Sequence, residues 1–256
     1  MYPMDFTGKV VVVTGASSGI GAATAKAFAL RGANLSLIGR NEQRLTQVAS
    51  ICEAAKNKKP LCLLLDLTID QNCEEVARKT VETFGRIDVL INSAGRAGVS
   101  SLFDNSMDVY DELHALNVRV PYKMTQVCVP HLKATKGSIV NVFGAPLRTR
   151  PGFLPFAMFR DALALFTHVG ALELSSEGIR MNGVRPGLTR TNFLLNLNVD
   201  EECLNAAYDV ISDIMPNNKI LEADEIARMV VFCASEICPN MIGSSVILDA
   251  GASKCA

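Results

Sequence analysis

The chain has 256 residues, 49% of them hydrophobic and 20% charged, which is enough to bury a large core and predicts one domain, residues 1–256. Its 25 basic residues are scattered and the formal net charge is -1, which argues against a nucleic-acid partner. No stretch reaches the ~18 apolar residues of a membrane span, and the first residues lack a signal-peptide pattern. We therefore expect no membrane or nucleic-acid partner and a soluble, cytoplasmic protein that binds small molecules.

Eight cysteines raise the question of disulfide bonds. None of them forms a CxxC pair, and a domain of this size does not need covalent cross-links to be stable. We expect free thiols in a reducing compartment, and we assign no metal site to the chain.

Short apolar runs alternate with longer amphipathic stretches along the chain. The apolar runs predict buried strands, and the amphipathic stretches predict crossover helices. Strands that are apolar on both faces and joined by helices form a parallel sheet covered on two sides. The predicted fold class is α/β, a single doubly wound Rossmann-type parallel sheet of about seven strands with helices on both faces. The predicted strands are residues 9–15, 34–39, 60–67, 87–95, 137–143, 179–187 and 244–251, and the predicted helices are residues 19–32, 42–56, 71–85, 108–134, 156–176 and 224–235.

Residues 190–220 fall outside this alternation and have little clear periodicity. In a doubly wound sheet, a segment that follows the carboxyl end of a strand lies beside the ligand crevice. We therefore expect residues 190–220 to form a substrate-covering lobe within the single domain.

The sequence TGASSGIG, residues 14–21, lies between the first predicted strand and the first predicted helix. Its glycines, Gly15, Gly19 and Gly21, allow a tight turn, a close approach of the backbone to a pyrophosphate, and close helix packing. The helix N-terminus then faces the anion, because its free backbone amides favour negative charge. A glycine triplet alone is weak evidence, but the strand before it and the helix after it predict a dinucleotide site.

The end of the second predicted strand, LIGRNEQRL, indicates which nucleotide binds. A carboxylate there holds the 2′-hydroxyl of the ribose, whereas an arginine accommodates a 2′-phosphate. Gly39 stands at the acid position, and Arg40 follows it. Arg40 alone could be a solvated loop residue, but a guanidinium matches a phosphate in bidentate geometry. We predict that NADP(H) is preferred over NAD(H), although Glu42 nearby weakens the preference.

Six motifs in order make the chain resemble the short-chain dehydrogenase/reductase family over essentially its whole length. TGASSGIG matches the glycine-rich loop TGxxxGIG of that family, and DLT, NSAG, LNV, RPGLTRT and LDAG follow in the family's order. DLT or LNV alone would mean nothing, but six motifs in the correct order leave little room for chance. The resemblance implies an oxidoreductase that transfers a hydride between a nicotinamide dinucleotide and a small-molecule substrate.

The resemblance also implies which residues contact the cofactor. By this likeness, Asp66 accepts a hydrogen bond from the adenine amino group, NSAG supports the sheet and passes along the adenosine ribose, and RPGLTRT flanks the nicotinamide. Asn117 kinks a helix and is tied to a proton-relay water. The implied cofactor-binding residues are Gly15, Ser17, Ser18, Gly19, Ile20, Gly21, Arg40, Asp66, Leu67, Asn92, Ala94, Gly95, Arg160, Pro186, Gly187, Leu188 and Thr191.

The chain departs from the family at the residues that carry its chemistry. The family uses a Tyr-x-x-x-Lys pair on the helix after the fifth strand and a serine in the loop before it. Here Phe156 stands at the tyrosine position and Arg160 at the lysine position. The serine position falls on Phe143, or on Gly144 if the loop is one residue shorter. The implied catalytic positions are therefore Asn117, Gly144, Phe156 and Arg160.

The loss of these groups has a known scale. A general acid is worth ~10²–10⁴-fold in rate and an oxyanion donor ~10²–10³-fold, although the two effects do not add. Other groups could take part, but each has an ordinary structural explanation. Arg148, Thr149 and Arg150 lie in a loop, and loops run over the surface. His114 could relay a proton, although a packed or exposed histidine is commoner, and Asp161 reads as a helix-surface carboxylate.

Three functions remain open at this point. We favour an NADP(H)-binding protein that is catalytically impaired. The second is an active NADP(H)-dependent reductase with an altered proton donor, acting on a quinone or an already polarised carbonyl. The third is a structural oligomer without nucleotide, which leaves the glycine loop unexplained. The resemblance further implies a homodimer or homotetramer that pairs through the helices bearing Asn117 and Phe156 and through the last strand.

Overall fold

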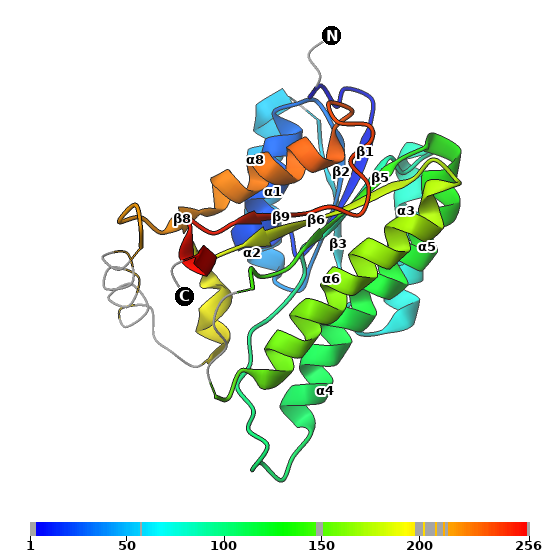
Figure 1. Ribbon diagram of the computed structural model, residues 1–256. Helices are drawn as coiled ribbons and strands as arrows, with labels where there is room; N and C mark the ends of the chain where they lie inside the picture. The colour runs from blue at the N-terminus through cyan, green and yellow to red at the C-terminus, as the bar shows by residue number, and fades with distance from the viewer. Residues whose placement is uncertain are drawn as a thin grey trace.

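The computed structural model describes residues 4–56, 58–146, 151–197 and 215–254, together with residues 202, 208 and 212, but not the side chains of residues 195 and 196. Seven parallel strands form one sheet in the order β3-β2-β1-β4-β5-β6-β9 (Figure 1). The strand order reverses between β1 and β4, which is the topological switch point where ligands bind in such sheets. The strands are β1 (Val10–Thr14), β2 (Asn34–Gly39), β3 (Leu61–Leu64), β4 (Val89–Asn92), β5 (Ser138–Val142), β6 (Arg180–Pro186) and β9 (Ser245–Leu248).

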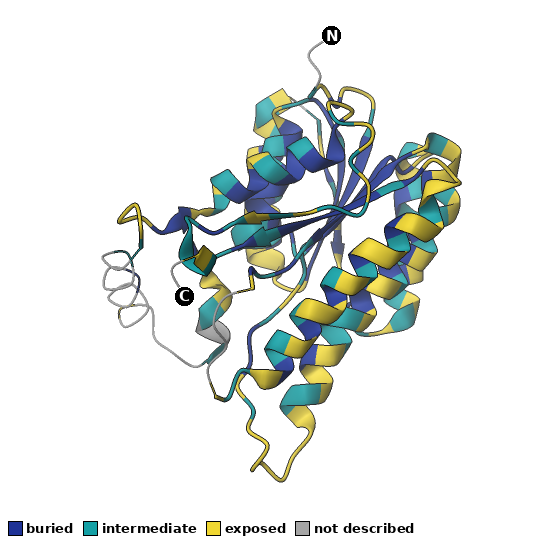
Figure 2. Cartoon of the chain, viewed as in Figure 1, coloured by how far each residue is buried: buried dark blue, intermediate teal, exposed yellow. Residues whose placement is uncertain are grey.

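Helices cover both faces of the sheet (Figure 1). Because successive side chains of a strand point to opposite faces, Val11 and Val13 of β1 join one core cluster and Val12 joins the other. The central strands are accordingly buried on both sides (Figure 2). None of the described helices combines the length and apolarity needed to cross a membrane. The first face carries α1 (Gly19–Ala29), α2 (Glu42–Lys56) and α8 (Ala223–Ala234), and the second carries α3 (Asp70–Phe84), α5 (Val120–Thr135) and α6 (Leu154–Ser175).

These observations confirm the predicted α/β fold, with one difference in the long helix predicted over 108–134. That stretch is divided into α4 (Asp108–His114), a π-helical turn η1 (Ala115–Arg119) and α5. Pro121 lies in the first turn of α5, directly after the π-helical turn. The π-helical turn carries Asn117, and such turns often occur at functional sites.

The outer strands differ from the prediction of strands that are apolar and buried on both faces. Every residue of β9 is exposed or half-buried, and in β3 only Leu63 is buried. Both strands lie at the edges of the sheet, where part of each face meets solvent. In the segment predicted as a lobe, the described parts include η2 (Asn192–Leu197) and the start of a small pair between β7 (Thr189–Arg190) and β8 (Leu221–Glu222). Residues 198–201, 203–207, 209–211, 213 and 214 of this segment lie outside the described residues.

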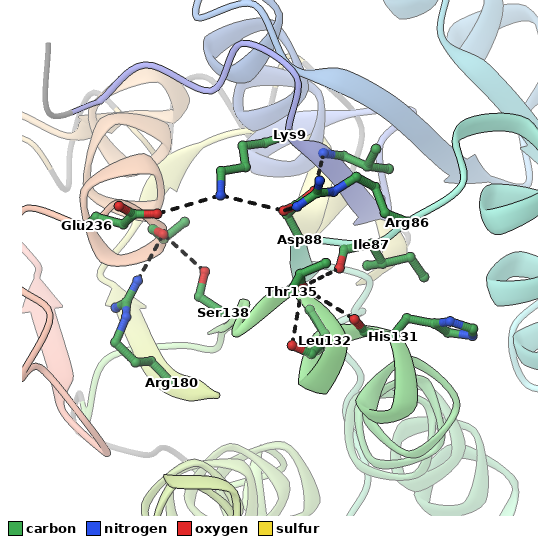
Figure 3. Close-up of polar contacts among 12 residues, drawn as sticks. Lys9, Arg86, Ile87, Asp88, His131, Leu132, Thr135, Ser138, Arg180 and Glu236 are labelled. Carbon is green, nitrogen blue, oxygen red and sulfur yellow. Dashed lines mark hydrogen bonds and ion pairs between the residues drawn. The ribbon is translucent and has the colours of Figure 1, made fainter. Parts of the chain in front are cut away.

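Ion pairs gather at the amino ends of the strands (Figure 3). The carboxylate of Asp88, only 3% exposed, accepts hydrogen bonds from the Val10 amide at 2.9 Å and from the Arg86 guanidinium at 2.8 and 2.6 Å. Lys9 Nζ lies 3.6 Å from both Asp88 and Glu236. This network joins β1, β4 and the turn after α8 at one end of the sheet.

Arg180 ties the end of α8 to the same region (Figure 3). Its guanidinium donates hydrogen bonds to the carbonyls of Cys233, Ala234 and Ser235 at 3.0, 3.0 and 2.8 Å. The last carbonyls of a helix have no partner within the helix, so this side chain satisfies them. Burial lowers the pKa of Arg180 below its ordinary value. These contacts lie at the amino ends of the strands, opposite the carboxyl ends where ligands bind in such sheets.

Candidate functional site

A cavity of about 910 Å³ opens at the carboxyl ends of the strands. Residues that directly follow or end β1, β2, β3, β4, β5 and β6 line it. Every residue that the sequence assigned to the cofactor or to catalysis lies on its wall except Asn92. The Asn92 side chain is 2% exposed and donates to Asn141 Oδ1 at 2.8 Å, so it joins β4 to β5 beneath the cavity.

The glycine-rich loop forms a cradle that only glycine permits. A Cβ at Gly21 would lie 2.3 Å from the carbonyl oxygen of Gly15, so any side chain there would push α1 off the loop. In the described chain the Ser18 side chain makes no capping hydrogen bond at the start of α1, and no acidic residue lies in the first turn. The amides at this helix start are therefore available to an anion, and the cradle fits the pyrophosphate of a dinucleotide.

The loop after β4 packs directly under the glycine-rich loop. Thr14 Oγ1 accepts hydrogen bonds from the amides of Ser93 and Ala94, both at 3.0 Å. A Cβ at Gly15 would lie 2.9 Å from Ala94 Cα, so the two loops touch through their backbones. This contact fixes the relative position of two cavity walls that come from separate strands.

Two arginines lie on the cavity wall after β2: Arg40 directly follows the strand, and Arg44 lies in the first turn of α2. Arg40 Nη1 lies 3.5 Å from Asp66 Oδ2, and the other Asp66 oxygen accepts hydrogen bonds from the Thr68 amide and hydroxyl at 3.0 and 2.8 Å. Partial burial opposes the ionisation of Asp66, but these hydrogen bonds and the Arg40 charge outweigh it and lower the pKa of Asp66. The sequence analysis did not identify Arg44, which lies one helical turn after Arg40.

The other end of the cavity brings Gly144, Phe156 and Arg160 together. A Cβ built on Gly144 would lie 3.6 Å from Arg160 Cδ and 4.0 Å from Phe156 Cζ, which are ordinary contact distances. Phe143 also lines the cavity, but its ring lies against Gly183 of β6 and beneath the Arg185 guanidinium. Of the two positions that the sequence left open for the serine, Gly144 is therefore the one that faces Phe156 and Arg160.

The Arg160 guanidinium is engaged within the protein. Nη1 donates to the Ala145 carbonyl at 3.1 Å, while Nε and Nη2 donate to the two carboxylate oxygens of Asp161 at 3.3 and 3.1 Å. Its side chain is 10% exposed. Among the described residues that line the cavity there is no tyrosine, lysine or histidine. At this end of the cavity Arg160 contributes a cation, and none of Gly144, Phe156 and Arg160 carries a hydroxyl group.

Asn117 closes the wall between the two ends. Its Oδ1 accepts from the Arg96 amide and its Nδ2 donates to the Arg96 carbonyl, both at 3.0 Å. The π-helical turn aims this side chain at the loop after β4. Asn117 is thus a direct support of the loop that lines the middle of the cavity.

We call the end of the cavity where Gly144, Phe156 and Arg160 meet the reacting end; His114 is not among the residues that line the cavity. His114 is exposed and its ring packs against Phe159, with centroids 5.5 Å apart. Arg148, Thr149 and Arg150 lie outside the described residues. Tyr208 is buried, and its hydroxyl lies 3.2 and 3.1 Å from the carbonyl oxygens of Thr189 and Thr191 rather than in the cavity.

Aromatic residues that the sequence analysis did not assign make the reacting end apolar. The Phe156 and Phe193 rings lie 6.0 Å apart between centroids. Phe193 follows the RPGLTRT motif, and no sequence pattern marked it as a site residue. Phe153 lies directly before α6 and also lines the cavity. The lining residues absent from the predicted set are Ile38, Gly39, Asn41, Arg44, Leu65, Ser93, Leu116, Val142, Phe143, Ala145, Phe153, Ala157, Phe159, Leu163, Thr189, Asn192, Phe193 and Leu194.

Comparison with known proteins gives consistent matches along the whole chain. The family model described as enoyl-(acyl carrier protein) reductase matches residues 15–253. An uncharacterized oxidoreductase of Thermotoga maritima is 30% identical over 97% of this chain and 98% of that protein. Carbonyl reductase (NADPH) 2 of Sus scrofa is 27% identical over 97% and 98%. A Caenorhabditis elegans short-chain dehydrogenase/reductase of unknown function, crystallised with cofactor, is similar with a TM-score of 0.90 and 32% identity over 97% of this chain and 96% of that chain.

Proposed function

The chain belongs to the short-chain dehydrogenase/reductase family, and from that premise we propose that it is an NADP(H)-binding protein whose carbonyl-reducing chemistry is impaired. One observation carries the proposal. Gly144, Phe156 and Arg160 meet at one point of a cavity whose other walls keep the dinucleotide-binding motifs. Holding a cofactor and donating a proton are separate physical tasks, so a pocket can keep one and lose the other.

The cofactor assignment rests on the chemistry of the cavity wall. The glycine-rich loop and the start of α1 would hold the pyrophosphate, and Arg40 and Arg44 would hold the 2′-phosphate. A carboxylate at Gly39 has no room, because its Cβ would lie 2.9 Å from Ser17 Cβ. The Sus scrofa relative is named for NADPH, which supports the same preference.

The impaired chemistry follows from what the chain offers at the reacting end. The bound cofactor would supply the hydride. A carbonyl substrate also needs a proton at its oxygen, and Phe156 has none to give. Gly144 has no hydroxyl with which to bind that oxygen, and a guanidinium does not serve as a proton donor in the way that a tyrosine hydroxyl does. The described wall would thus bind and orient the cofactor and a substrate, but Gly144, Phe156 and Arg160 would not donate a proton to the substrate oxygen.

The experiment that tests this proposal measures binding first. We expect NADPH to raise the melting temperature of the protein and to change its fluorescence on binding, because a ligand that binds only the folded form stabilises it. Arg40→Gln should weaken NADPH binding by about 10- to 100-fold, the worth of a charge-assisted hydrogen bond, and leave NADH binding nearly unchanged. Arg78→Gln, an exposed arginine on α3, is the matched control and should change neither.

Turnover is measured in the same preparations. The unaltered protein should show no reduction of simple ketones above background. The variant with Phe156→Tyr, Gly144→Ser and Arg160→Lys should gain it, because Gly144 has space for a side chain. Brisk ketone reduction by the unaltered protein, or no NADPH binding, would contradict the proposal.

A second candidate is an active reductase for quinones or polarised carbonyls. The observation that favours it is the pair of apolar rings, Phe156 and Phe193, beside the retained cation of Arg160. Such substrates need little help from a proton donor. Quinone reduction that disappears in Arg160→Ala would establish this candidate over the impaired one.

We also propose that the chain forms a homodimer or homotetramer through α5, α6 and β9. The outer face of α6 carries three exposed apolar side chains, Leu165, Val169 and Leu172, at 63%, 50% and 61% exposure. Ile247 of the edge strand β9 is 39% exposed. Contiguous exposed apolar residues of this kind are typical of a surface that another subunit covers.

A further inference from the structure

Asp161, the residue after Arg160 in α6, makes contacts that an isolated surface carboxylate would not make. Its Oδ1 accepts from Arg160 Nε at 3.3 Å and from Arg185 Nη2 at 3.0 Å, and its Oδ2 accepts from Arg160 Nη2 at 3.1 Å. The side chains of Arg160 and Arg185 are only 10% and 12% exposed, whereas that of Asp161 is 58% exposed. One carboxylate therefore joins two largely buried cations from α6 and β6.

Each of these guanidinium groups also donates to the loop that follows β5. Arg160 Nη1 donates to the Ala145 carbonyl at 3.1 Å, and Arg185 Nε donates to the Gly144 carbonyl at 3.2 Å. The contacts form a closed network that runs from the loop to α6, then to β6, and back to the loop. All three nitrogens of the Arg160 guanidinium donate within this network.

The network also sets the charge state around Arg160. Partial burial opposes the ionisation of Asp161, but the hydrogen bonds and charges of Arg160 and Arg185 outweigh it and lower the pKa of the Asp161 carboxyl. The guanidinium groups of Arg160 and Arg185 and the carboxylate of Asp161 together carry a net charge of +1. The cation of Arg160 is thus paired inside the wall of the cavity, although the side chain itself lines the cavity.

We propose that Asp161 is a positioning residue of the cavity. It holds the Arg160 guanidinium on the Gly144–Ala145 loop and so withholds that cation from a bound dinucleotide. This inference rests on the proposed NADP(H)-binding function and adds Asp161 to the residues that shape this end of the cavity. It also replaces the interpretation of Asp161 as a plain helix-surface carboxylate.

The test measures the dissociation constant for NADPH in Asp161→Ala. Removing the carboxylate frees a cation beside a ligand that carries several negative charges, so we expect binding to become about threefold or more tighter at low ionic strength. The gain should shrink as salt is added, because the freed charge is then screened. A purely structural role would instead weaken binding together with the melting temperature.

Three matched variants separate the positioning role from a general charge effect. In an Arg160→Ala background, Asp161→Ala should change NADPH affinity by less than about twofold, because the group that it positions is gone. Asp161→Glu keeps a carboxylate and should restore the affinity of the unaltered protein. Glu173→Ala removes an exposed carboxylate from the same helix and should have no effect.

The outcomes distinguish this inference from the function on which it rests. If the unaltered protein does not bind NADPH, the proposed function fails and the inference fails with it. If it binds NADPH but Asp161→Ala leaves the affinity unchanged, weakens it, or tightens it equally without Arg160, only the positioning role is overturned.

Discussion

At the scale of single residues, Gly144, Phe156 and Arg160, which by family resemblance stand at the positions of the serine, the tyrosine and the lysine, differ in their surroundings. Gly144 leaves open space, since a Cβ there would make only ordinary contacts. Phe156 differs from tyrosine by one oxygen and keeps the ring in place against Phe193. Arg160 instead makes new bonds to Ala145 and Asp161. Reversing the first two changes therefore adds a group to an existing space, while reversing the third also breaks a network.

Ala250 is held in a backbone conformation that favours glycine. Its φ is 53°, in the turn after β9 where the Asp249 carboxylate accepts the amides of Gly251 and Ser253 at 3.0 and 2.9 Å. A left-handed conformation costs a residue with a Cβ about 1–2 kcal/mol, and glycine loses about 0.5–1 kcal/mol more chain entropy on folding. We predict that Ala250→Gly raises the free energy of unfolding by about 0.5–1 kcal/mol, measured by urea denaturation.

The control for this prediction is the same substitution with the opposite expected sign. Ala54 is exposed on α2, where glycine is a poor helix former, so Ala54→Gly should lower the free energy of unfolding by about 1 kcal/mol. If Ala250→Gly destabilises the protein as Ala54→Gly does, the strain at position 250 is not real.

At the scale of helices and strands, the elements that are buried on both faces were the ones that the sequence could predict. Valine-rich runs such as VVVVT give the central strands, because strands covered on both faces are apolar throughout. The π-helical turn over Ala115–Arg119 was not predictable, since a segment of five residues is too short for its period to be distinguished from that of an α-helix. The β7–β8 pair is only two residues per strand and has too short a pattern to detect.

The same physical limits apply to the candidate site. The backbone loops were predictable because glycine and proline mark turns, and the structure places those loops on one cavity. The choice between Phe143 and Gly144 was not, because it depends on where β5 ends and which way the chain then turns. The pairing of Arg160 with Asp161 was hidden as well, since neighbouring positions on a helix do not normally face each other.

Arg180 donates hydrogen bonds to the last carbonyls of α8, so its replacement should destabilise the end of that helix. Arg180→Met removes the donor to three carbonyls and keeps the apolar stem, so we expect a loss of about 2–4 kcal/mol in the free energy of unfolding. Arg180→Lys should lose less, because the ammonium can still reach some of these oxygens. Urea denaturation of both variants measures the effect.

The control is Arg78→Met on the outer face of α3, which should change stability by less than about 0.5 kcal/mol. Because Arg180 lies at the end of the sheet away from the cavity, the affinity of the folded Arg180 variants for NADPH should stay unchanged. A large loss of affinity with normal stability would contradict this account of Arg180.

At the scale of the whole molecule, the two-sided core explains the cysteine content. Cys52, Cys73, Cys128 and Cys233 are all buried as free thiols. Burial raises the pKa of Cys128 to about 12 and those of Cys52, Cys73 and Cys233 to about 11. Since only the thiolate reacts, these cysteines behave as small apolar residues of the core.

We predict that iodoacetamide at mildly alkaline pH modifies Cys62, which is exposed on β3 although partial burial raises the pKa of its thiol, and leaves the four buried cysteines unmodified while the protein is folded. In denaturant every cysteine should react, as mass spectrometry of the peptides would reveal. Cys62→Ser provides the control, because it removes the exposed thiol without touching the core. Rapid modification of Cys128 in the folded protein would mean that the core opens far more often than its packing implies.

The layout of the cavity has an evolutionary consequence. The loops that would grip the cofactor follow β1, β2, β3, β4 and β6, so they are dispersed through the gene, whereas Gly144, Phe156, Arg160 and Asp161 fall within one short stretch. A single recombination event across that stretch could exchange the reactivity of the protein with that of a relative and leave its hold on the nucleotide untouched. Under the proposed function, loss and recovery of turnover would therefore be one genetic step apart.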